Sequence, residues 1–310
     1  VNPGQRAYVR RIEFYGNTTT QDEVLRREMI QLEGAPASTE SITQSRQRLE
    51  RLGFFSQVEV DTQPVPGQPD LLDVTYNVEE QPSGSVSASV GFSQSAGVIY
   101  GVGLAQNNFL GTGNRVNVGA QRSDTFTSVN FAFTDPYWTL DGISRGYNVF
   151  YRETDYADSD ISTFSTDAYG AGINFGYPIS ELSRLNFGAS IEDTTVKTYF
   201  DTASEIRRYV EDEGDNAQSL KLTASWTRNN LNRGIMPTAG NYQRLSLETG
   251  VPGSDAEYYK VQARAQQLFP INDDQTWAFK FSGNLGYADT LASNDPYPFY
   301  ENFYAGGLGS

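Results

Sequence analysis

The sequence contains no cysteine and no histidine. Without cysteine, these 310 residues cannot form a disulfide bond, a thiol nucleophile or a zinc–thiolate site. Without histidine, the chain lacks the commonest general base and metal ligand. No pair of acidic residues has a spacing that nominates an acid–base dyad. We therefore expect a protein that is not an enzyme and has no catalytic residue, no metal site and no cofactor.

Long apolar runs are also missing. No stretch approaches the ~20 consecutive apolar residues that a transmembrane helix requires, which excludes a helical membrane protein but not a membrane β-barrel. The chain opens at Val1 without the charged and apolar regions of a signal peptide. If the protein is exported, we expect this sequence to begin inside the mature chain.

Basic residues are few, with 23 Lys and Arg against 38 Asp and Glu, so the net charge is −15. This charge argues against a nucleic-acid partner, because the phosphate backbone repels an acidic surface. Apolar residues make up only 38% of the chain, whereas aromatic residues reach 13%. This combination is typical of chains that alternate apolar and polar residues, as transmembrane β-barrels do.

The first 82 residues predict a compact α+β module with the order β-α-α-β-β. Thr20 with Glu23 resembles a capping box at the start of the first helix, and Gly53 is a stop signal for the second. A proline-containing turn at 64–69 separates the last two strands. The five elements are expected at 8–14, 24–29, 39–52, 55–62 and 72–78.

Beyond Pro82 the hydrophobic period becomes two and stays there, as along residues 86–92. About eleven such strands, each near the ~10 residues of a tilted membrane strand, predict a transmembrane antiparallel β-barrel. A soluble β-sandwich also alternates, but its strands average about five or six residues. The face opposite the aromatic residues carries charges such as Glu192 and Lys221, which we expect to solvate a wet lumen.

The predicted connections between these strands differ in length. Residues 111–113 and 178–183 form tight turns, whereas 153–163 and 198–218 form long acidic loops. Barrels place short turns on the periplasmic side and long loops outside. If the N-terminal module is periplasmic, the first strand rises outward, and both long loops are then outside the cell.

Several motifs resemble those of the BamA family of outer-membrane β-barrel assembly proteins. The first three are similar to the last POTRA (polypeptide-transport-associated) domain of that family, and the rest to its barrel. In chain order they are YVRRI (8–12), VLRREM (24–29), RLGFF (51–55), NFLGTG (108–113), TDPY (134–137), LNRG (231–234) and FYENFYAGG (299–307). The resemblance covers essentially the whole chain, with the motifs in order.

The resemblance implies a POTRA domain at 1–82, followed at 83–310 by a transmembrane barrel with about 11 of an expected 16 strands. We therefore expect a fragment, with further POTRA domains before it and strands after it. The implied location is the outer membrane of a Gram-negative bacterium, with the POTRA domain in the periplasm.

The resemblance also implies a function. The family folds and inserts outer-membrane proteins without ATP, through a lateral seam at its first strand that pairs with the incoming strand by β-augmentation. The expected partners are BamD-like and other periplasmic lipoproteins, nascent outer-membrane proteins, and outer-membrane lipid and lipopolysaccharide. A TamA-like assembly factor and a two-partner secretion pore have the same architecture and are the alternatives.

Three candidate sites follow. The inward face of the first barrel strand is only serine and glycine, which suits a weak seam or merely a crowded lumen. Arg26 and Glu33 match family positions that dock a periplasmic lipoprotein; the alternative is an ordinary surface ion pair. The sixth extracellular loop is expected to start at Phe303, Tyr304, Ala305, Gly306 and Gly307. The expected gate strand consists of Ser83, Gly84, Ser85, Val86, Ser87, Ala88, Ser89, Val90 and Gly91.

Overall fold

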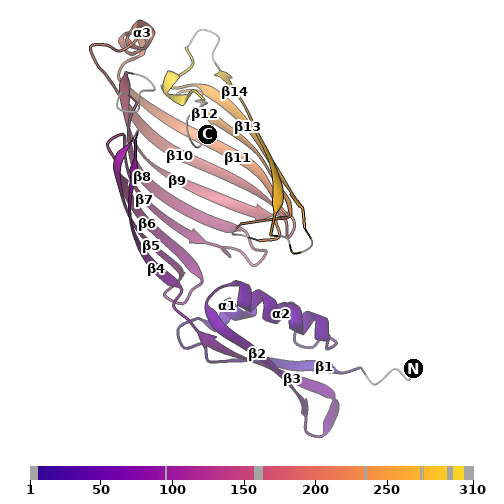
Figure 1. Ribbon diagram of the computed structural model, residues 1–310. Coiled ribbons are helices and arrows are strands. Elements are labelled where there is room, and N and C mark those ends of the chain that lie inside the picture. Colours follow the sequence, from indigo (N-terminus) through magenta and orange to yellow (C-terminus); the bar gives the residue numbers. More distant parts are fainter. Residues whose placement is uncertain are drawn as a thin grey trace. The chain divides into compact units, whose positions relative to one another are not determined.

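The computed structural model describes most of the chain (Figure 1). The described residues are 6–94, 96–156, 163–233, 236–272, 274, 276–291 and 296–303. They form two compact units, the first made of Val1–Val86 with Leu104–Asn117 and the second of Ser87–Gly103 with Val118–Ser310. Among the described residues, no helix is long and apolar enough to cross a membrane.

The first unit contains the predicted β-α-α-β-β module. Its elements are β1 (Tyr8–Tyr15), α1 (Asp22–Arg26), α2 (Thr39–Arg51), β2 (Phe55–Val65) and β3 (Gln68–Glu80). The sheet order is β1-β3-β2, with β1 parallel and β2 antiparallel to β3. The order of elements is as predicted, and the two long strands extend into the predicted turn, which is reduced to residues 66–67.

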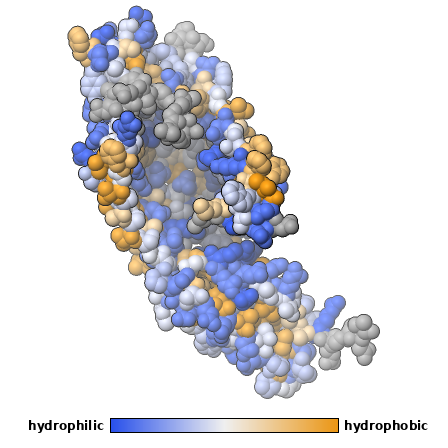
Figure 2. Space-filling view, in the orientation of Figure 1, coloured by the Kyte–Doolittle hydropathy of each residue, from blue (hydrophilic) through white to orange (hydrophobic). Residues whose placement is uncertain are grey.

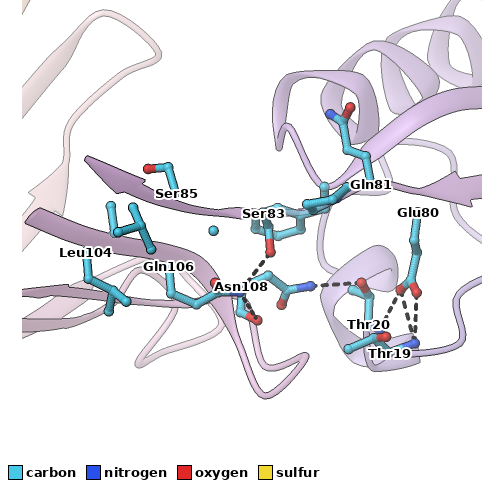
Figure 3. A pocket seen from close by; sticks show the side chains of 14 residues that line it. Thr19, Thr20, Glu80, Gln81, Ser83, Ser85, Leu104, Gln106 and Asn108 are labelled. Carbon is cyan, nitrogen blue, oxygen red and sulfur yellow. Dashed lines mark hydrogen bonds between the residues drawn. The ribbon is translucent and has the colours of Figure 1, made fainter. Parts of the chain in front are cut away.

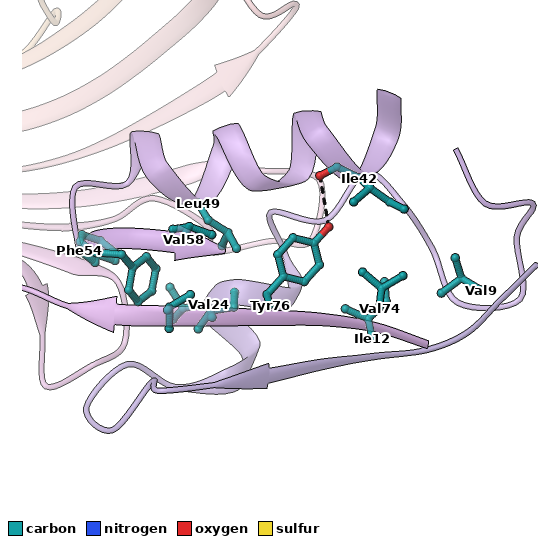
Figure 4. Close-up of a cluster of buried hydrophobic side chains, with 12 residues drawn as sticks. Val9, Ile12, Val24, Ile42, Leu49, Phe54, Val58, Val74 and Tyr76 are labelled. Atoms are coloured by element: carbon teal, nitrogen blue, oxygen red, sulfur yellow. Dashed lines mark hydrogen bonds between the residues drawn. The ribbon is translucent and has the colours of Figure 1, made fainter. Parts of the chain in front are cut away.

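The core of this module lies between one face of the sheet and the helices (Figure 4). Alternation along β3 turns Val74 and Tyr76 toward α2, where Leu49 is fully buried. The Tyr76 hydroxyl donates a hydrogen bond to the carbonyl of Ile42 at 3.3 Å, so its polar end is satisfied. Each such side chain contributes roughly 1.5–3 kcal/mol by leaving water.

The predicted capping box at Thr20 is wrong. Gln21 precedes α1 in an extended conformation and caps it with no side-chain hydrogen bond. The Thr20 hydroxyl instead accepts a hydrogen bond from Asn108 Nδ2 at 2.8 Å, and its backbone N–H donates to Glu80 at 2.6 Å. Thr20 is therefore used by partners distant in sequence, which a local pattern does not reveal.

Eleven strands form a second sheet of the described residues, in which each strand is hydrogen-bonded to its sequence neighbours. The sheet is antiparallel and curved, with β4 and β14 at its two edges (Figure 1). The strands are β4 (Gly84–Ser93), β5 (Gly97–Phe109), β6 (Asn114–Arg122), β7 (Phe126–Asp135), β8 (Ser144–Asp155), β9 (Phe164–Pro178), β10 (Ser183–Thr198), β11 (Asn216–Asn229), β12 (Gly240–Gly250), β13 (Tyr258–Pro270) and β14 (Ala278–Thr290).

The outer face of this sheet is apolar and exposed. Register places Phe187 opposite Ala224 and Ile191 opposite Leu220, so apolar side chains of β10 and β11 share one face. Ile191 is 67% exposed, and Leu285 of β14 is 78% exposed. Apolar residues line the outer sides of the sheet in Figure 2. A soluble sandwich buries such a face, whereas a membrane barrel presents it to lipid.

One predicted loop contains an additional helix, α3 (Ser204–Glu213), within residues 198–218. Ile206, Tyr209 and Val210 have helical spacing and are partly buried. The Tyr209 ring packs edge-on against Phe299, with centroids 5.2 Å apart. Phe299 begins a short 3₁₀ helix, η1 (Phe299–Glu301), so α3 contacts the segment that follows β14.

Candidate functional site

Strand β4 is an edge strand of the described sheet, with β5 as its one hydrogen-bonded neighbour there. Every residue from Gly84 to Phe92 is exposed, including Val86 at 82% and Val90 at 76%. An edge strand presents a row of backbone N–H and C=O groups to a further strand. Of the predicted gate residues, Gly84 to Gly91 therefore lie along β4, whose backbone has the chemistry to pair with another strand by β-augmentation, and Ser83 directly precedes the strand.

The small residues of β4 pack against glycines of β5. The Ser87 hydroxyl donates a long hydrogen bond to the Gly103 carbonyl at 3.5 Å. A Cβ added at Gly101 would lie 2.6 Å from Ser89 Oγ, so a serine occupies the space that this glycine leaves. Serine hydroxyls against glycine backbone bury little apolar surface between β4 and β5. The role of β4 as a seam stays a prediction.

A pocket of about 570 Å³ lies beside the start of β4, lined only by residues of the first unit (Figure 3). Ser85, Val86 and Leu104 contribute to its wall. Ser83 is already engaged, since its hydroxyl accepts from Gln106 Nε2 at 3.0 Å and its carbonyl from the Asn107 N–H at 3.0 Å. The start of β4 is thus fixed to β5 while the next residues face the pocket.

Glu80, at the end of β3, binds the loop that leads into α1 (Figure 3). Its carboxylate accepts from Thr18 Oγ1 at 2.8 Å, from the Thr19 N–H at 2.9 Å and from the Thr20 N–H at 2.6 Å. Burial raises the pKa of Glu80, but these hydrogen bonds outweigh burial and lower the pKa to about 2. Sequence reasoning missed Glu80. The sequence feature that could have indicated it is the position of an acidic residue directly before the junction between the module and the first barrel strand.

The NFLGTG turn contacts the same loop, within the first unit. Asn108 Oδ1 accepts the Gly113 N–H at 2.7 Å, while its Nδ2 donates to Thr20. The Gln21 N–H donates to the Gly111 carbonyl at 2.9 Å. Gly111 has a φ of +75°, and an added Cβ would lie 2.0 Å from the Thr19 carbonyl oxygen. Both the conformation and the close approach require glycine.

The structure brings Arg26 and Glu33 together on the edge of β1. Arg26 Nη1 lies 3.4 Å from Glu33 Oε1, and Arg26 Nε lies 2.6 Å from Asp22 Oδ2. Glu33 Oε1 accepts the Ile12 N–H at 2.7 Å, and Arg26 Nη2 donates to the Ile12 carbonyl at 3.2 Å. Both side chains are about half-exposed, at 47% and 46%. They therefore satisfy an edge backbone and still present opposite charges to solvent.

Four charged residues form a buried cluster on the inner face of the sheet. Lys221 Nζ lies 3.0 Å from Glu192 Oε2 and 2.8 Å from Glu301 Oε1, and Lys260 Nζ lies 2.7 Å from Glu301 Oε2. Glu192 and Lys221 are each only 7% exposed. Arg152, which is half-exposed, adds a longer contact of 3.7 Å from its Nη2 to Glu192 Oε1. The expectation that Glu192 and Lys221 solvate an open lumen is therefore wrong, because Glu301 of η1 pairs with Lys221 and both residues are buried.

Of the predicted loop start, Phe303 lies within the described residues, and Tyr304, Ala305, Gly306 and Gly307 lie outside them. Phe303 packs on Gly286 of β14, where an added Cβ would lie 2.8 Å from its ring. Lys260 Nζ lies 5.4 Å from the Phe303 ring centroid.

Comparison with known proteins matches both parts of the chain. The Omp85 superfamily domain matches residues 108–310, and POTRA, described as a surface antigen variable number repeat, matches residues 7–81. The outer membrane protein assembly factor BamA of Neisseria meningitidis serogroup B is 36% identical over 320 residues, covering 100% of this chain and 40% of that protein. The sorting and assembly machinery component 50 homolog A of Xenopus laevis is 26% identical over 96% of this chain and 63% of its own length.

A solved structure of BamA from Haemophilus ducreyi lacking POTRA domains 1–3 superposes with a TM-score of 0.81. The two sequences are 33% identical, and the match covers 99% of this chain and 60% of the Haemophilus ducreyi chain. These matches confirm the predicted resemblance, the POTRA-plus-barrel fold and the outer-membrane location with a periplasmic POTRA domain. The domain boundary after residue 82 and the roles of the three candidate sites stay predictions.

Proposed function

Because the chain belongs to the Omp85 superfamily and carries a POTRA domain, we propose that it is part of an insertase that folds proteins into the outer membrane. The chain spans about 40% of the length of its curated relative from Neisseria meningitidis. The single observation that carries the proposal is the build of β4, the first barrel strand, which directly follows the POTRA module and whose inward face is only serine and glycine.

The proposed mechanism is strand templating. In lipid, each unsatisfied backbone polar group costs several kcal/mol, so a nascent strand cannot enter the bilayer with a free edge. The N–H and C=O groups of β4 supply partners for that edge, and the outward Val86, Val90 and Phe92 continue the lipid-facing surface beside it. The driving force is hydrogen bonding and apolar burial, so the step needs no ATP, no catalytic side chain and no cofactor.

We further propose that Arg26 and Glu33 dock a BamD-like periplasmic lipoprotein. The support is their geometry, since a guanidinium and a carboxylate lie side by side and half-exposed on the POTRA module. The guanidinium can donate two parallel hydrogen bonds to a carboxylate of the partner, and the carboxylate can accept from a basic side chain of the partner. Nascent outer-membrane proteins, outer-membrane lipid and lipopolysaccharide complete the set of proposed partners.

The test is site-specific photo-cross-linking in cells that produce the full-length protein. A photoreactive residue at Val90 on β4 should cross-link to nascent outer-membrane proteins of several kinds. The same residue at Val149 is the matched control, because Val149 is also an exposed outward valine but lies on β8, which is paired on both sides. Equal yields from both positions would contradict templating by β4.

The identity of the cross-linked chains separates the proposal from its alternatives. Several outer-membrane proteins indicate a general insertase, a narrow subset indicates a TamA-like factor, and one exported protein indicates a secretion pore. A disulfide between β4 and the final strand of the full-length barrel provides a second readout. Growth that fails under this lock and recovers with reductant supports lateral opening, and normal growth with the lock confirmed contradicts it.

A further inference from the structure

The charged side chain of Arg145 lies on the outer, apolar face of the second unit. Arg145 is in β8, where alternation places it on the same face as Tyr147, Val149 and Tyr151. These three neighbours are between 37% and 55% exposed, as lipid-facing residues are. A cation on this face is costly within the hydrocarbon region and is tolerated where it reaches the headgroups.

Aromatic rings hold the Arg145 guanidinium in place. Its central carbon lies 5.1 Å from the Trp138 ring centroid and 5.5 Å from that of Tyr147. The Trp138 ring in turn lies 5.4 Å from Phe175 of the adjacent strand β9. These contacts orient the planar donor fork by cation–π attraction without satisfying its N–H groups.

The protein leaves this guanidinium short of hydrogen-bond acceptors. The nearest carboxylate oxygen, Asp135 Oδ2, is 4.0 Å from Arg145 Nη2, which is beyond hydrogen-bond distance. The other oxygen of Asp135 already accepts the Tyr137 N–H at 3.1 Å. Arg145 Nε is buried and has no hydrogen-bond partner among the residues that the structure describes. A charged donor without an acceptor is expensive. The Arg145 side chain is 30% exposed, so an external anion can reach the outer N–H groups of its guanidinium.

The position of Arg145 relative to the apolar band of the barrel indicates which anion it meets. The next charge on the same face of β8 is Glu153, roughly 27 Å further along at about 3.4 Å per residue. This separation is close to the ~25 Å height of the apolar band of a membrane barrel, before strand tilt. Arg145 therefore lies at one border of the band, on the side of the short turn at 136–143. Short turns are periplasmic in such barrels.

We propose that Arg145 and Trp138 form a binding site for the phosphodiester group of one phospholipid in the periplasmic leaflet. A guanidinium fork matches two phosphate oxygens and is stronger than a point charge at such a site. The indole ring lies at the height of the glycerol backbone, where tryptophan is favoured at membrane interfaces. The site binds a structural lipid and is independent of strand templating at β4.

The test uses the full-length protein reconstituted with phosphatidylglycerol and phosphatidylethanolamine, then transferred to mild detergent for native mass spectrometry. The wild type should retain one phospholipid, and Arg145→Gln should reduce that occupancy about tenfold. Arg244→Gln is the matched control, because it removes the same charge from the opposite, inner face, next to outward-facing Leu245. Equal retention by the wild type and Arg145→Gln would overturn the proposal, as would equal loss in both variants.

Two further measurements distinguish a phospholipid site from simple charge attraction and from a site for free phosphate. Arg145→Lys keeps the charge without the fork and should still lose most of the retained lipid, and so should Trp138→Leu; full retention in both would overturn the site. Millimolar inorganic phosphate should leave the lipid bound, whereas displacement would indicate a site for free phosphate. Resistance of each variant to unfolding in unheated SDS confirms that its barrel is intact.

Discussion

Lys221 and Glu301 lie 80 residues apart in the sequence, and their side chains meet at 2.8 Å on the inner face of the sheet. The second oxygen of Glu301 binds Lys260, so one carboxylate joins η1 to both β11 and β13. Phe299 adds an edge-on contact with Phe164 of β9, with centroids 4.9 Å apart. The η1 segment, which precedes the predicted start of the sixth loop, is therefore attached to the sheet by paired charges and by aromatic packing.

Removing one member of this cluster should destabilise the barrel. Lys221→Met removes the buried cation that Glu192 and Glu301 share and leaves Glu192 with only the half-exposed Arg152 at 3.7 Å. Breaking a buried pair typically costs about 3–5 kcal/mol. We expect a lower temperature for loss of the folded, faster-migrating band on SDS gels. Lys280→Met is the control. Lys280 lies in β14 on the same inner face of the sheet as the cluster, but its side chain is exposed. Equal melting of the two variants would show that the cluster contributes nothing.

Gly111 and Gly34 allow a test of close backbone approach. Both have a φ of +75°, but an added Cβ meets the Thr19 carbonyl at 2.0 Å in one case and nothing within 4 Å in the other. Gly34→Ala should cost only the conformational penalty of about 1–2 kcal/mol. Gly111→Ala should cost about 1–3 kcal/mol more, because the backbone must move. Thermal unfolding by circular dichroism measures both, and similar values would contradict the contact between the turn and the Thr19 loop.

Glu80 should make stability depend on acid pH. Its pKa is lowered to about 2 in the folded chain, so its contribution is complete above about pH 4.5 and is lost as pH falls toward 2. Glu80→Gln should cost about 1–3 kcal/mol at pH 7 through weaker hydrogen bonds to three donors. Its stability should then converge on that of the wild type near pH 2. Urea unfolding across this range is the measurement.

The control for this titration is Glu79→Gln, which removes an exposed carboxylate one residue earlier on β3. It should keep the acid dependence of the wild type. If Glu79→Gln and Glu80→Gln have the same pH profile, the three hydrogen bonds do not hold Glu80 ionised.

Neutralising Glu33 should weaken partner binding while leaving the stability of the POTRA module almost unchanged. Glu33→Gln retains an acceptor for the Ile12 N–H and removes only a half-exposed charge, so stability should change by under about 1 kcal/mol. If the proposed docking role holds, affinity for a BamD-like lipoprotein should fall about tenfold, or ~1.4 kcal/mol. The control is Glu50→Gln, which neutralises a similar exposed pair, Arg46–Glu50 at 2.9 Å on α2. Equal effects on binding, measured by calorimetry, would mean a non-specific electrostatic contribution and no docking site at Glu33.

Alternation in the sequence was enough to predict the barrel strands, because lipid and lumen impose opposite requirements on neighbouring residues. Residues 185–191 show this well, since every second side chain is apolar, and Phe187 and Ile191 are 50% and 67% exposed in the structure. The same pattern predicted the face on which Glu192 lies but not its burial. Its partners Lys221 and Glu301 come from distant segments, and no local period encodes their meeting.

Local rules failed where a distant group competes for the same atoms. Thr20 has the sequence context of a helix cap, yet Glu80 and Asn108 take its N–H and hydroxyl. In α3, a polar composition concealed the apolar spacing of Ile206, Tyr209 and Val210. Alternation along β8 places Arg145 on the outer face, but no local pattern reveals the ring of Trp138 beside it, which comes from the preceding turn.

The side chains on β1 also affect which strand edges are available to a client. The N–H and C=O of Ile12 are bound by Glu33 and Arg26, and the Val9 N–H and carbonyl pair with Ala35 and Gly34. Any segment that is to pair with β1 must therefore first displace these bonds. The edge of β1 thus has an activation barrier for strand addition that is set by residues of its own module. Under the proposed function, this barrier would keep nascent strands from pairing with the POTRA sheet, without any discrimination between client sequences.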